Sequence, residues 1–245
     1  TSTVCAPGDI SSCWQGYPGW LRANALIWGS AYGYGYTVTR PHTEALTDID
    51  GKETPVKLYM GTRLCPVPPN GPKRANYTPV IMPGFAPLFV RTTDMAPCPN
   101  SVDEKTVREG VTELARLFNE TPYLWGGRTT EGIDCSGLVN LVYRVYGVNL
   151  PRNADAQFRA ATLLTGEKIK DSIAPGDLVF VSQKDNPGHM EHVLLYLEDD
   201  ALIEACRESG KVAETTFKKR LGKKLKKFKQ GDNVDGHTIY FGKVF

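Results

Sequence analysis

The sequence predicts an α+β protein in which a small β-rich module precedes two helices and then an antiparallel sheet. Proline and glycine are concentrated in the first hundred of the 245 residues, which favours strands and turns there. Apolar residues recur at helical spacing just after residue 100, and strand-like patterns dominate from residue 176 onwards. This change of pattern predicts a domain boundary near residue 100.

The first hundred residues are expected to contain β structure in two parts. Residues 1–33 predict a partial β segment, of which "GYPGWLRANAL" at 16–26 is the most distinct piece. Residues 34–99 predict a small β-barrel, because apolar and polar residues alternate between proline and glycine turns. Residues 100–245 are then expected to form the second, larger domain.

Two helices are expected at the start of the second domain. Ser101 and Glu104 have the spacing of a capping box, which predicts a helix over 102–119. The apolar positions that support this helix are Val107, Val111, Leu114, Ala115 and Phe118. A second helix is expected to begin at Cys135 and to end at Gly147, a plausible C-terminal cap.

The remainder of the chain predicts a sheet and one more helix. Four apolar runs, "LVFVS", "EHVLLYLE", "ALIEACRE" and "HTIYFGKVF", are expected to be strands. Between the last two, residues 217–229 carry eight Lys or Arg and no acid around a stripe of four apolar residues. This segment predicts a helix whose basic face is either solvated or holds anionic polymers.

Charge and hydropathy exclude two classes of partner. The formal net charge is +2, and outside 217–229 the chain has 21 basic and 27 acidic residues, so no general basic surface for nucleic acid is expected. No apolar run reaches the length of a membrane span. The first residues lack the basic and apolar regions of a signal peptide, which we expect to have been removed if one existed.

The six cysteines do not form a metal-binding pattern. No Cys-x-x-Cys pair occurs, so neither a zinc site nor any other metal or cofactor is expected. Cys5 with Cys13 and Cys65 with Cys98 could form disulfides in an oxidising compartment, but the spacing alone does not decide the pairing. Cys206 is expected to be a core cysteine.

Cys135 has the position of a nucleophile. It begins an expected helix, where free N–H groups and the helix dipole favour a thiolate. The same N–H groups can stabilise the oxyanion of an acyl-transfer intermediate. Asp134 directly precedes it and is a candidate for binding a cationic group of the substrate.

A base and a third polar residue follow in the sheet. His192 opens a strongly apolar strand, and Glu204 lies twelve residues later within "ALIEACRE". A carboxylate among apolar strand residues should be paired, and on an adjacent strand it would fix the tautomer of His192. Each residue alone has an ordinary structural interpretation, but the combination favours nucleophilic catalysis.

The segment "PYLWGGRTTEGIDCSGLVNLVYRVYGVNLPR" at 122–152 closely resembles the NlpC/P60 cysteine peptidases. The resemblance continues through "APGDLVF" and "HVLLYL" and covers roughly residues 103–245. It implies a papain-like catalytic domain with helices packed on an antiparallel sheet. "VKLYMGTRL" and "YTPVIMPGFAPLFVRTTDMAP" resemble bacterial SH3-like (SH3b) domains less specifically.

The resemblance also implies residue roles. Cys135 is the nucleophile, His192 the base and Glu204 the third triad residue, where many relatives have histidine. Tyr123 matches a tyrosine that relatives direct at the oxyanion. The substrate-binding residues implied are Asp134, Ser136, Arg152 and Trp125. Asn153 departs from the acidic residue of relatives, which weakens the expectation that Asp134 binds a free N-terminal amine.

The function implied is peptidoglycan hydrolysis by a DL-endopeptidase that cuts the γ-D-glutamyl–diamino acid bond of stem peptides or muropeptides. Two alternatives remain: a papain-like amidase or acyltransferase acting on another amide, and a non-catalytic wall-binding protein. We expect a monomer that is secreted, periplasmic or associated with the cell wall.

Overall fold

The computed structural model describes residues 33–245 except 49, 51, 69, 70, 72, 73, 83–85, 100, 166 and 167. Nearly all of the β segment predicted for 1–33, with Cys5 and Cys13, therefore lies outside the described residues. The described chain forms two compact units. Among the described residues, the first unit contains those from 33 to 101 and Val145–Gly147, and the second contains Val102–Arg144 and Val148–Phe245.

The first unit is built from short antiparallel strands. Its main sheet has the order β6-β5-β4-β1-β7, and a separate hairpin pairs β2 with β3. A bridge between Leu46 and Phe89 joins the hairpin side of the unit to β6. The elements are β1 (Tyr36–Val38), β2 (His42–Ala45), β3 (Val56–Tyr59), β4 (Arg63–Pro66), β5 (Tyr77–Ile81), β6 (Leu88–Arg91), η2 (Thr92–Asp94) and β7 (Met95–Pro97). Strands are present as expected, and the SH3-like assignment stays a prediction.

Cys65 and Cys98 are free thiols in the structure. Both cysteines lie beside Gly35, because Gly35 donates to Leu64 O (3.0 Å) and Cys98 donates to Gly35 O (2.9 Å). The two cysteine-bearing segments are thus separated by the chain that leads into β1. Twice the spacing between neighbouring strands is roughly 9.5 Å, beyond the roughly 7 Å limit on Cα separation for a disulfide. The possible Cys65–Cys98 bridge is therefore not present.

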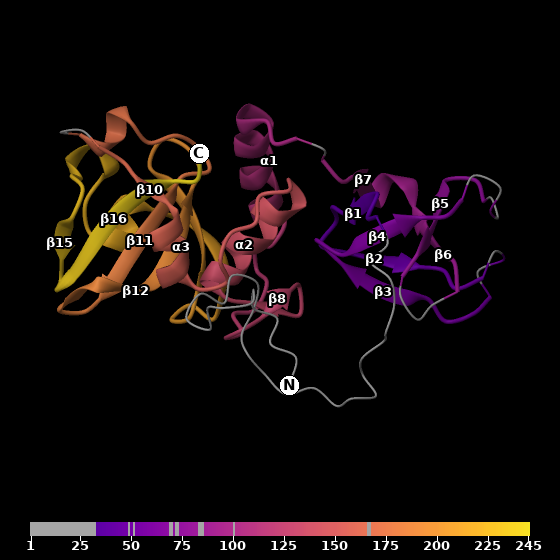
Figure 1. Ribbon diagram of the computed structural model, residues 1–245. Coiled ribbons are helices and arrows are strands. Elements are labelled where there is room, and N and C mark those ends of the chain that lie inside the picture. The colour runs from indigo at the N-terminus through magenta and orange to yellow at the C-terminus, as the bar shows by residue number, and fades with distance from the viewer. Residues whose placement is uncertain are drawn as a thin grey trace, which may run out of the picture. The chain divides into compact units, whose positions relative to one another are not determined.

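The second unit contains a seven-stranded antiparallel sheet in its described part. The order is β10-β16-β11-β12-β13-β14, and β15 pairs with β16. The strands are β10 (Thr162–Leu163), β11 (Leu178–Gln183), β12 (Asn186–Tyr196), β13 (Ala201–Cys206), β14 (Lys211–Thr216), β15 (Asp232–Val234) and β16 (His237–Lys243). Figure 1 shows β16, β11 and β12 side by side with α3 next to β12.

The helices of the second unit are α1 (Glu104–Arg116), α2 (Cys135–Val145), α3 (Ala154–Ala160) and α4 (Phe217–Leu221), with 3-10 turns η3 (Ile169–Asp171) and η4 (Leu225–Lys227). A short ribbon of β8 (Arg128–Thr129) and β9 (Gly132–Ile133) leads into α2. Two contacts fix α1 and α2 to the turn before β11. Tyr143 donates to Gly176 O (2.6 Å), and Arg108 pairs with Asp177 (2.7 Å). Within the described residues, no helix has the length and apolarity needed to cross a bilayer.

The sequence predicted the C-terminal cap of α2 correctly but not the N-terminal cap of α1. The prediction of Gly147 as the cap of α2 is confirmed, since it has φ +81° and Val148 N donates to Tyr143 O (3.1 Å). The predicted capping box at Ser101 is wrong. Asp103 is the N-cap of α1 and accepts from Thr106 N (2.9 Å), because its carboxylate reaches the third helical residue.

The predicted helix over 217–229 is too long. The helix α4 ends at Leu221, because Gly222 adopts φ +75°, and η4 follows as a separate turn. The apolar stripe of this segment is nevertheless buried. Phe217, Leu221, Leu225 and Phe228 all belong to the core cluster beneath the sheet.

Candidate active site

Cys135 is the first residue of α2, and its neighbours show why the helix begins there. Asp134 accepts a hydrogen bond from Gly137 N (2.7 Å), which is the geometry of an N-cap. Gly137 is required at this point, since a Cβ would lie 2.6 Å from Gly127 O. The first N–H groups of a helix have no partner within it, so a helix that begins at Cys135 offers donors suited to an anion.

His192 comes from β12 and Glu204 from the neighbouring strand β13. Leu195 pairs with Ile203, and the continuation of this register places His192 and Glu204 diagonally on one face of the sheet. Nε2 of His192 lies 2.5 Å from Oε2 of Glu204, which is only 4% exposed. The other ring nitrogen, Nδ1, is therefore the one left for Cys135.

The electrostatics of the pair favour a thiolate and an imidazolium. Burial alone would raise the pKa of the Cys135 thiol, but the charge and hydrogen bond of His192 lower it below its ordinary value. Asp134 opposes this by raising the pKa of Cys135. Burial would lower the pKa of His192, but Cys135 and Glu204 together raise it to about 10. Glu204 stays ionised, because His192 and Arg220 hold its pKa below the ordinary range despite burial.

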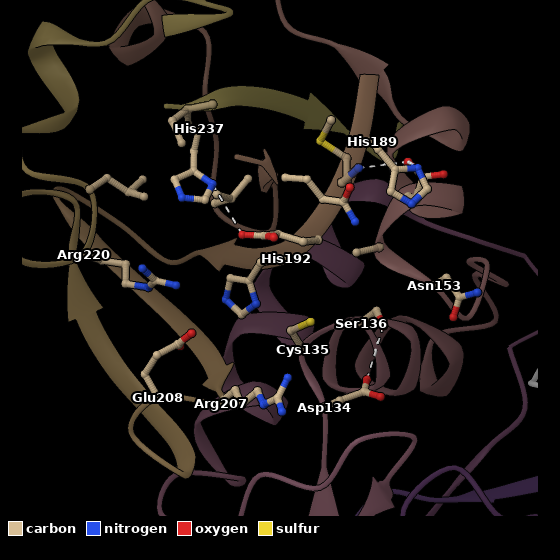
Figure 2. A pocket seen from close by; sticks show the side chains of 18 of the residues that line it. Asp134, Cys135, Ser136, Asn153, His189, His192, Arg207, Glu208, Arg220 and His237 are labelled. Atoms are coloured by element: carbon tan, nitrogen blue, oxygen red, sulfur yellow. Dashed lines mark hydrogen bonds and ion pairs between the residues drawn. The ribbon is translucent and has the colours of Figure 1, made fainter. Parts of the chain in front are cut away.

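A cavity of about 770 Å³ opens at the thiol and lies wholly within the second unit. Figure 2 shows Cys135 and His192 facing each other on its wall. Tyr123 and Trp125 also line it, and Trp125 is 70% exposed. The cavity is of the size that small ligands occupy. Cys135 and His192, predicted from separate parts of the chain, thus meet at one cavity, and Glu204 contacts His192 without lining it.

Asp134 and Arg152 form an ion pair with each other. Both are almost fully buried, and Arg152 donates from Nη1 to Oδ1 (2.7 Å) and from Nη2 to Oδ2 (2.6 Å). Gly126 N and Gly137 N donate to the same carboxylate, each at 2.7 Å. The hydroxyl of Ser136 lies 3.0 Å from Arg152 Nη1. Arg152 does not line the cavity, in contrast to the substrate contact that the sequence predicted for it.

Other polar residues of the cavity were not predicted from the sequence. They come from α3, the start of β12, the β13–β14 turn, α4 and the start of β16: Asp155, Arg159, His189, Glu191, Arg207, Glu208, Arg220 and His237. Two of these pairs are fixed by contacts, namely His189 with Asp155 (3.5 Å) and His237 with Glu191 (3.4 Å). Among the residues with described positions, no group of His, Cys, Asp and Glu is arranged to hold a metal ion.

The helix α3 was not predicted, because seven residues are too few to show a clear helical pattern in the sequence. It spans seven residues, and Gln157 at its centre donates to Ser136 O (2.9 Å) and Pro151 O (2.8 Å). One feature of the sequence does distinguish Arg220 from its neighbours. Arg220 is the one arginine among the eight basic residues of 217–229.

Known proteins of the NlpC/P60 family are similar to this chain in sequence. The sequence model of the NlpC/P60 family matches residues 120–229. The probable endopeptidase NlpC of Escherichia coli is 34% identical over 118 residues, which are 47% of this chain and 73% of that protein. The chain belongs to the NlpC/P60 family. The matched region contains Cys135, His192, Glu204 and the cavity residues up to Arg220.

Longer relatives in this NlpC/P60 family match more of the chain at lower identity. The γ-D-glutamyl-L-lysine dipeptidyl-peptidase of Bacillus cereus is 24% identical over 204 residues, 81% of this chain. The chain spans only 59% of the length of that relative. A solved NlpC/P60 family protein from the same B. cereus strain covers 86% of the chain and 63% of its own, with a TM-score of 0.66 at 19% identity. This likeness shows a shared fold.

Proposed function

We propose that the protein is a peptidoglycan hydrolase that uses Cys135 to cleave the γ-D-glutamyl–diamino acid bond of cell-wall stem peptides. The observation that carries the proposal is the placement of Cys135 at a helix N-terminus, beside a histidine whose second nitrogen is held by a buried carboxylate. Membership of the NlpC/P60 family, and relatives named as dipeptidyl-peptidases and endopeptidases, support the substrate class.

The reaction follows from the two charged partners. The Cys135 thiolate attacks the scissile carbonyl, and the N–H groups at the start of α2 with the Tyr123 hydroxyl stabilise the oxyanion. The His192 imidazolium then gives its proton to the leaving amine of the diamino acid. In the second half-reaction, neutral His192 takes a proton from water, which attacks the acyl-enzyme and releases the γ-D-glutamyl acid.

Glu204 acts on His192 throughout. Its carboxylate accepts a hydrogen bond from the Nε2–H group and stays ionised, so that Nδ1 faces Cys135 and carries the proton that is transferred during the reaction. The substrate lies in the cavity between α3, the start of β12 and the β13–β14 turn. Trp125 is placed at the cavity to contact the peptide, which accords with its exposed ring.

The proposal is tested by incubating purified tripeptide and tetrapeptide muropeptides with the protein and with Cys135→Ala. The expected products of the unsubstituted protein have the masses of a fragment ending in D-glutamate and a diamino acid fragment with a new amine. Cys135→Ala should give neither. Products with other masses would assign the cysteine to an amidase or acyltransferase instead.

A protein that binds sacculi with no cleavage of any fragment would be a wall-binding protein rather than an enzyme. Sedimentation of Cys135→Ala with insoluble peptidoglycan separates binding from cleavage. We also propose that the protein works outside the cytoplasmic membrane or at the cell wall, where its substrate is found, and that it acts as a monomer.

A further inference from the structure

Arg220 extends the line of charged residues that begins at Cys135. Its Nε lies 2.8 Å from Oε1 and 3.0 Å from Oε2 of Glu204, whose Oε2 is also the partner of His192. In Figure 2, His192 lies between Arg220 and Cys135. The side chain of Glu204 is 4% exposed and that of Arg220 is 31% exposed. The carboxylate is therefore held from two sides by nitrogen donors, within a site largely closed to water.

The position of Arg220 is fixed by the contacts of α4. Thr216 caps α4 by accepting from Lys219 N (3.2 Å), and Phe217 and Leu221 are buried on either side of Arg220. These contacts leave the guanidinium directed at β13 rather than at solvent. The other seven basic residues of 217–229 are lysines. A guanidinium is planar, remains charged and suits a carboxylate better than an ammonium does.

The charges along this line balance only when Arg220 is included. The resting site holds a thiolate, an imidazolium and a carboxylate, which sum to one negative charge in a buried region. Burying a charge without a counter-charge is unfavourable in free energy, and a buried carboxylate in that situation usually takes up a proton and becomes neutral. The guanidinium of Arg220 brings the sum to zero and allows all three groups to remain ionised.

We propose that Arg220 is a positioning residue that keeps Glu204 ionised and aimed at His192, and so sustains the reactive form of Cys135. The proposal rests on the proposed function only in that Cys135 is the nucleophile. It assigns Arg220 no contact with the substrate.

Other titratable groups face this part of the site. Cys206 and Glu208 act on Arg220 together with Glu204, and the thiol of Cys206 donates to Glu208 (3.0 Å). Cys135 and Glu204 act on His192, and Asp134 acts on Cys135. His192 and Arg220 are the main charged partners of Glu204. The most direct effect of losing Arg220 is therefore on the ionisation of the Glu204 carboxylate.

The test compares Arg220→Met, Arg220→Gln and Arg220→Lys, alone and combined with Glu204→Gln. The rate of alkylation of Cys135 by iodoacetamide is followed from pH 4 to 10 by the mass of the Cys135 peptide, which separates it from the other five cysteines. This reaction needs no wall peptide, so it stays informative if the substrate assignment fails. The kcat/KM for a defined muropeptide is measured in parallel.

We expect the acid limb of both curves to move to higher pH in Arg220→Met and Arg220→Gln, because Glu204 then takes up a proton more readily. Arg220→Lys retains the charge and should keep the limb near its original position. The kcat/KM of the two neutral variants should fall by about 10- to 100-fold, as for other residues that support a catalytic group. In the Glu204→Gln background, Arg220→Met should have no further effect.

Two results would overturn the proposal. An acid limb unmoved in Arg220→Met and Arg220→Gln would show that Arg220 does not control Glu204. An equal loss of kcat/KM from Arg220→Met with and without Glu204→Gln would make Arg220 a substrate contact. If Arg220→Met fails to fold, the comparison of Arg220→Gln with Arg220→Lys decides the question, since both keep a donor and only one keeps the charge.

Discussion

Asp134 directly precedes the cysteine, and its hydrogen bonds determine which role it can take. Its two oxygens accept from two backbone N–H groups and from both terminal nitrogens of Arg152. A carboxylate has about four acceptor positions, so these contacts fill it. The charge of Asp134 is also balanced by Arg152. Together with the neutral Asn153, this leaves no strong site for a substrate ammonium at this carboxylate.

We therefore predict that the protein does not require a free N-terminal amine on its substrate. The kcat/KM for L-Ala-γ-D-Glu-diamino acid peptides with free and acetylated N-termini should differ by less than roughly tenfold. Loss of a buried charge pair costs about 2–5 kcal/mol, which is about 30-fold or more. A loss of a hundredfold or more on acetylation would show that an acidic residue of the cavity binds the amine.

Tyr123 is the second residue whose role can be isolated. It lines the cavity, and its backbone is fixed by a hydrogen bond from its N–H to Gly210 O (2.7 Å). If its hydroxyl stabilises the oxyanion, Tyr123→Phe should lower kcat by roughly 100- to 1000-fold with little change in the alkylation of Cys135. An unchanged kcat would leave the N–H groups of α2 as the oxyanion donors.

At the scale of elements, the start of α2 depends on the buried pair of Asp134 and Arg152. Arg152→Met would leave the carboxylate buried without a counter-charge. We predict a loss of about 3–5 kcal/mol in the free energy of unfolding, measured with urea. Arg159→Met is the matched control, because Arg159 pairs with Asp155 on α3 but is itself 61% exposed, so its loss should cost about 1 kcal/mol or less. Equal losses in both variants would contradict this account of α2.

The elements differ in how far the sequence could predict them. The helix α2 and strands β11, β12, β13 and β16 were expected, because each has a long apolar pattern of its own. The helix α3 and strand β14 were missed, since seven- and six-residue elements with few apolar residues have weak patterns. The helix α4 was drawn too long because the apolar stripe continues past Gly222, where the backbone turns.

The candidate site shows the same limit. Cys135, His192 and Glu204 could be proposed from motif order and polarity, but their distances depend on the register of β12 against β13. The pairing of β12 with β11 on its other side includes a bulge at Glu191, which shifts that register by one residue next to His192. The pairing of Arg152 with Asp134 and of Arg220 with Glu204 joins residues 18 and 16 positions apart, and no local pattern indicates either contact.

At the scale of the whole molecule, one segment carries a strong excess of positive charge. Residues 217–229 carry eight basic residues, whereas the rest of the chain has more acidic than basic residues. Lys224, Lys226 and Lys227 are exposed, while the apolar residues between them are buried. This pattern favours an amphipathic segment whose basic face is solvated.

We predict that replacing Lys224, Lys226 and Lys227 together by Gln changes the free energy of unfolding by no more than about 0.5 kcal/mol per residue. Hydrolysis of soluble muropeptides should be unchanged, and so should sedimentation with sacculi. If the triple variant lost sedimentation that is sensitive to salt in the original protein, the basic face would instead hold anionic wall polymers.

The reactivity of Cys135 as a function of pH measures the ionisation on which the chemistry depends. His192 lowers the pKa of the thiol below its ordinary value, which is roughly 8.5, so half-maximal alkylation of Cys135 should occur below about pH 8.5. Muropeptide hydrolysis should fall above pH about 10, where His192 loses the proton needed by the leaving amine. His192→Ala should return the alkylation midpoint to about pH 8.5 or higher, because burial then raises the pKa of Cys135 without opposition from His192. A midpoint at or above about pH 8.5 in the unsubstituted protein would contradict a thiolate–imidazolium pair at this site.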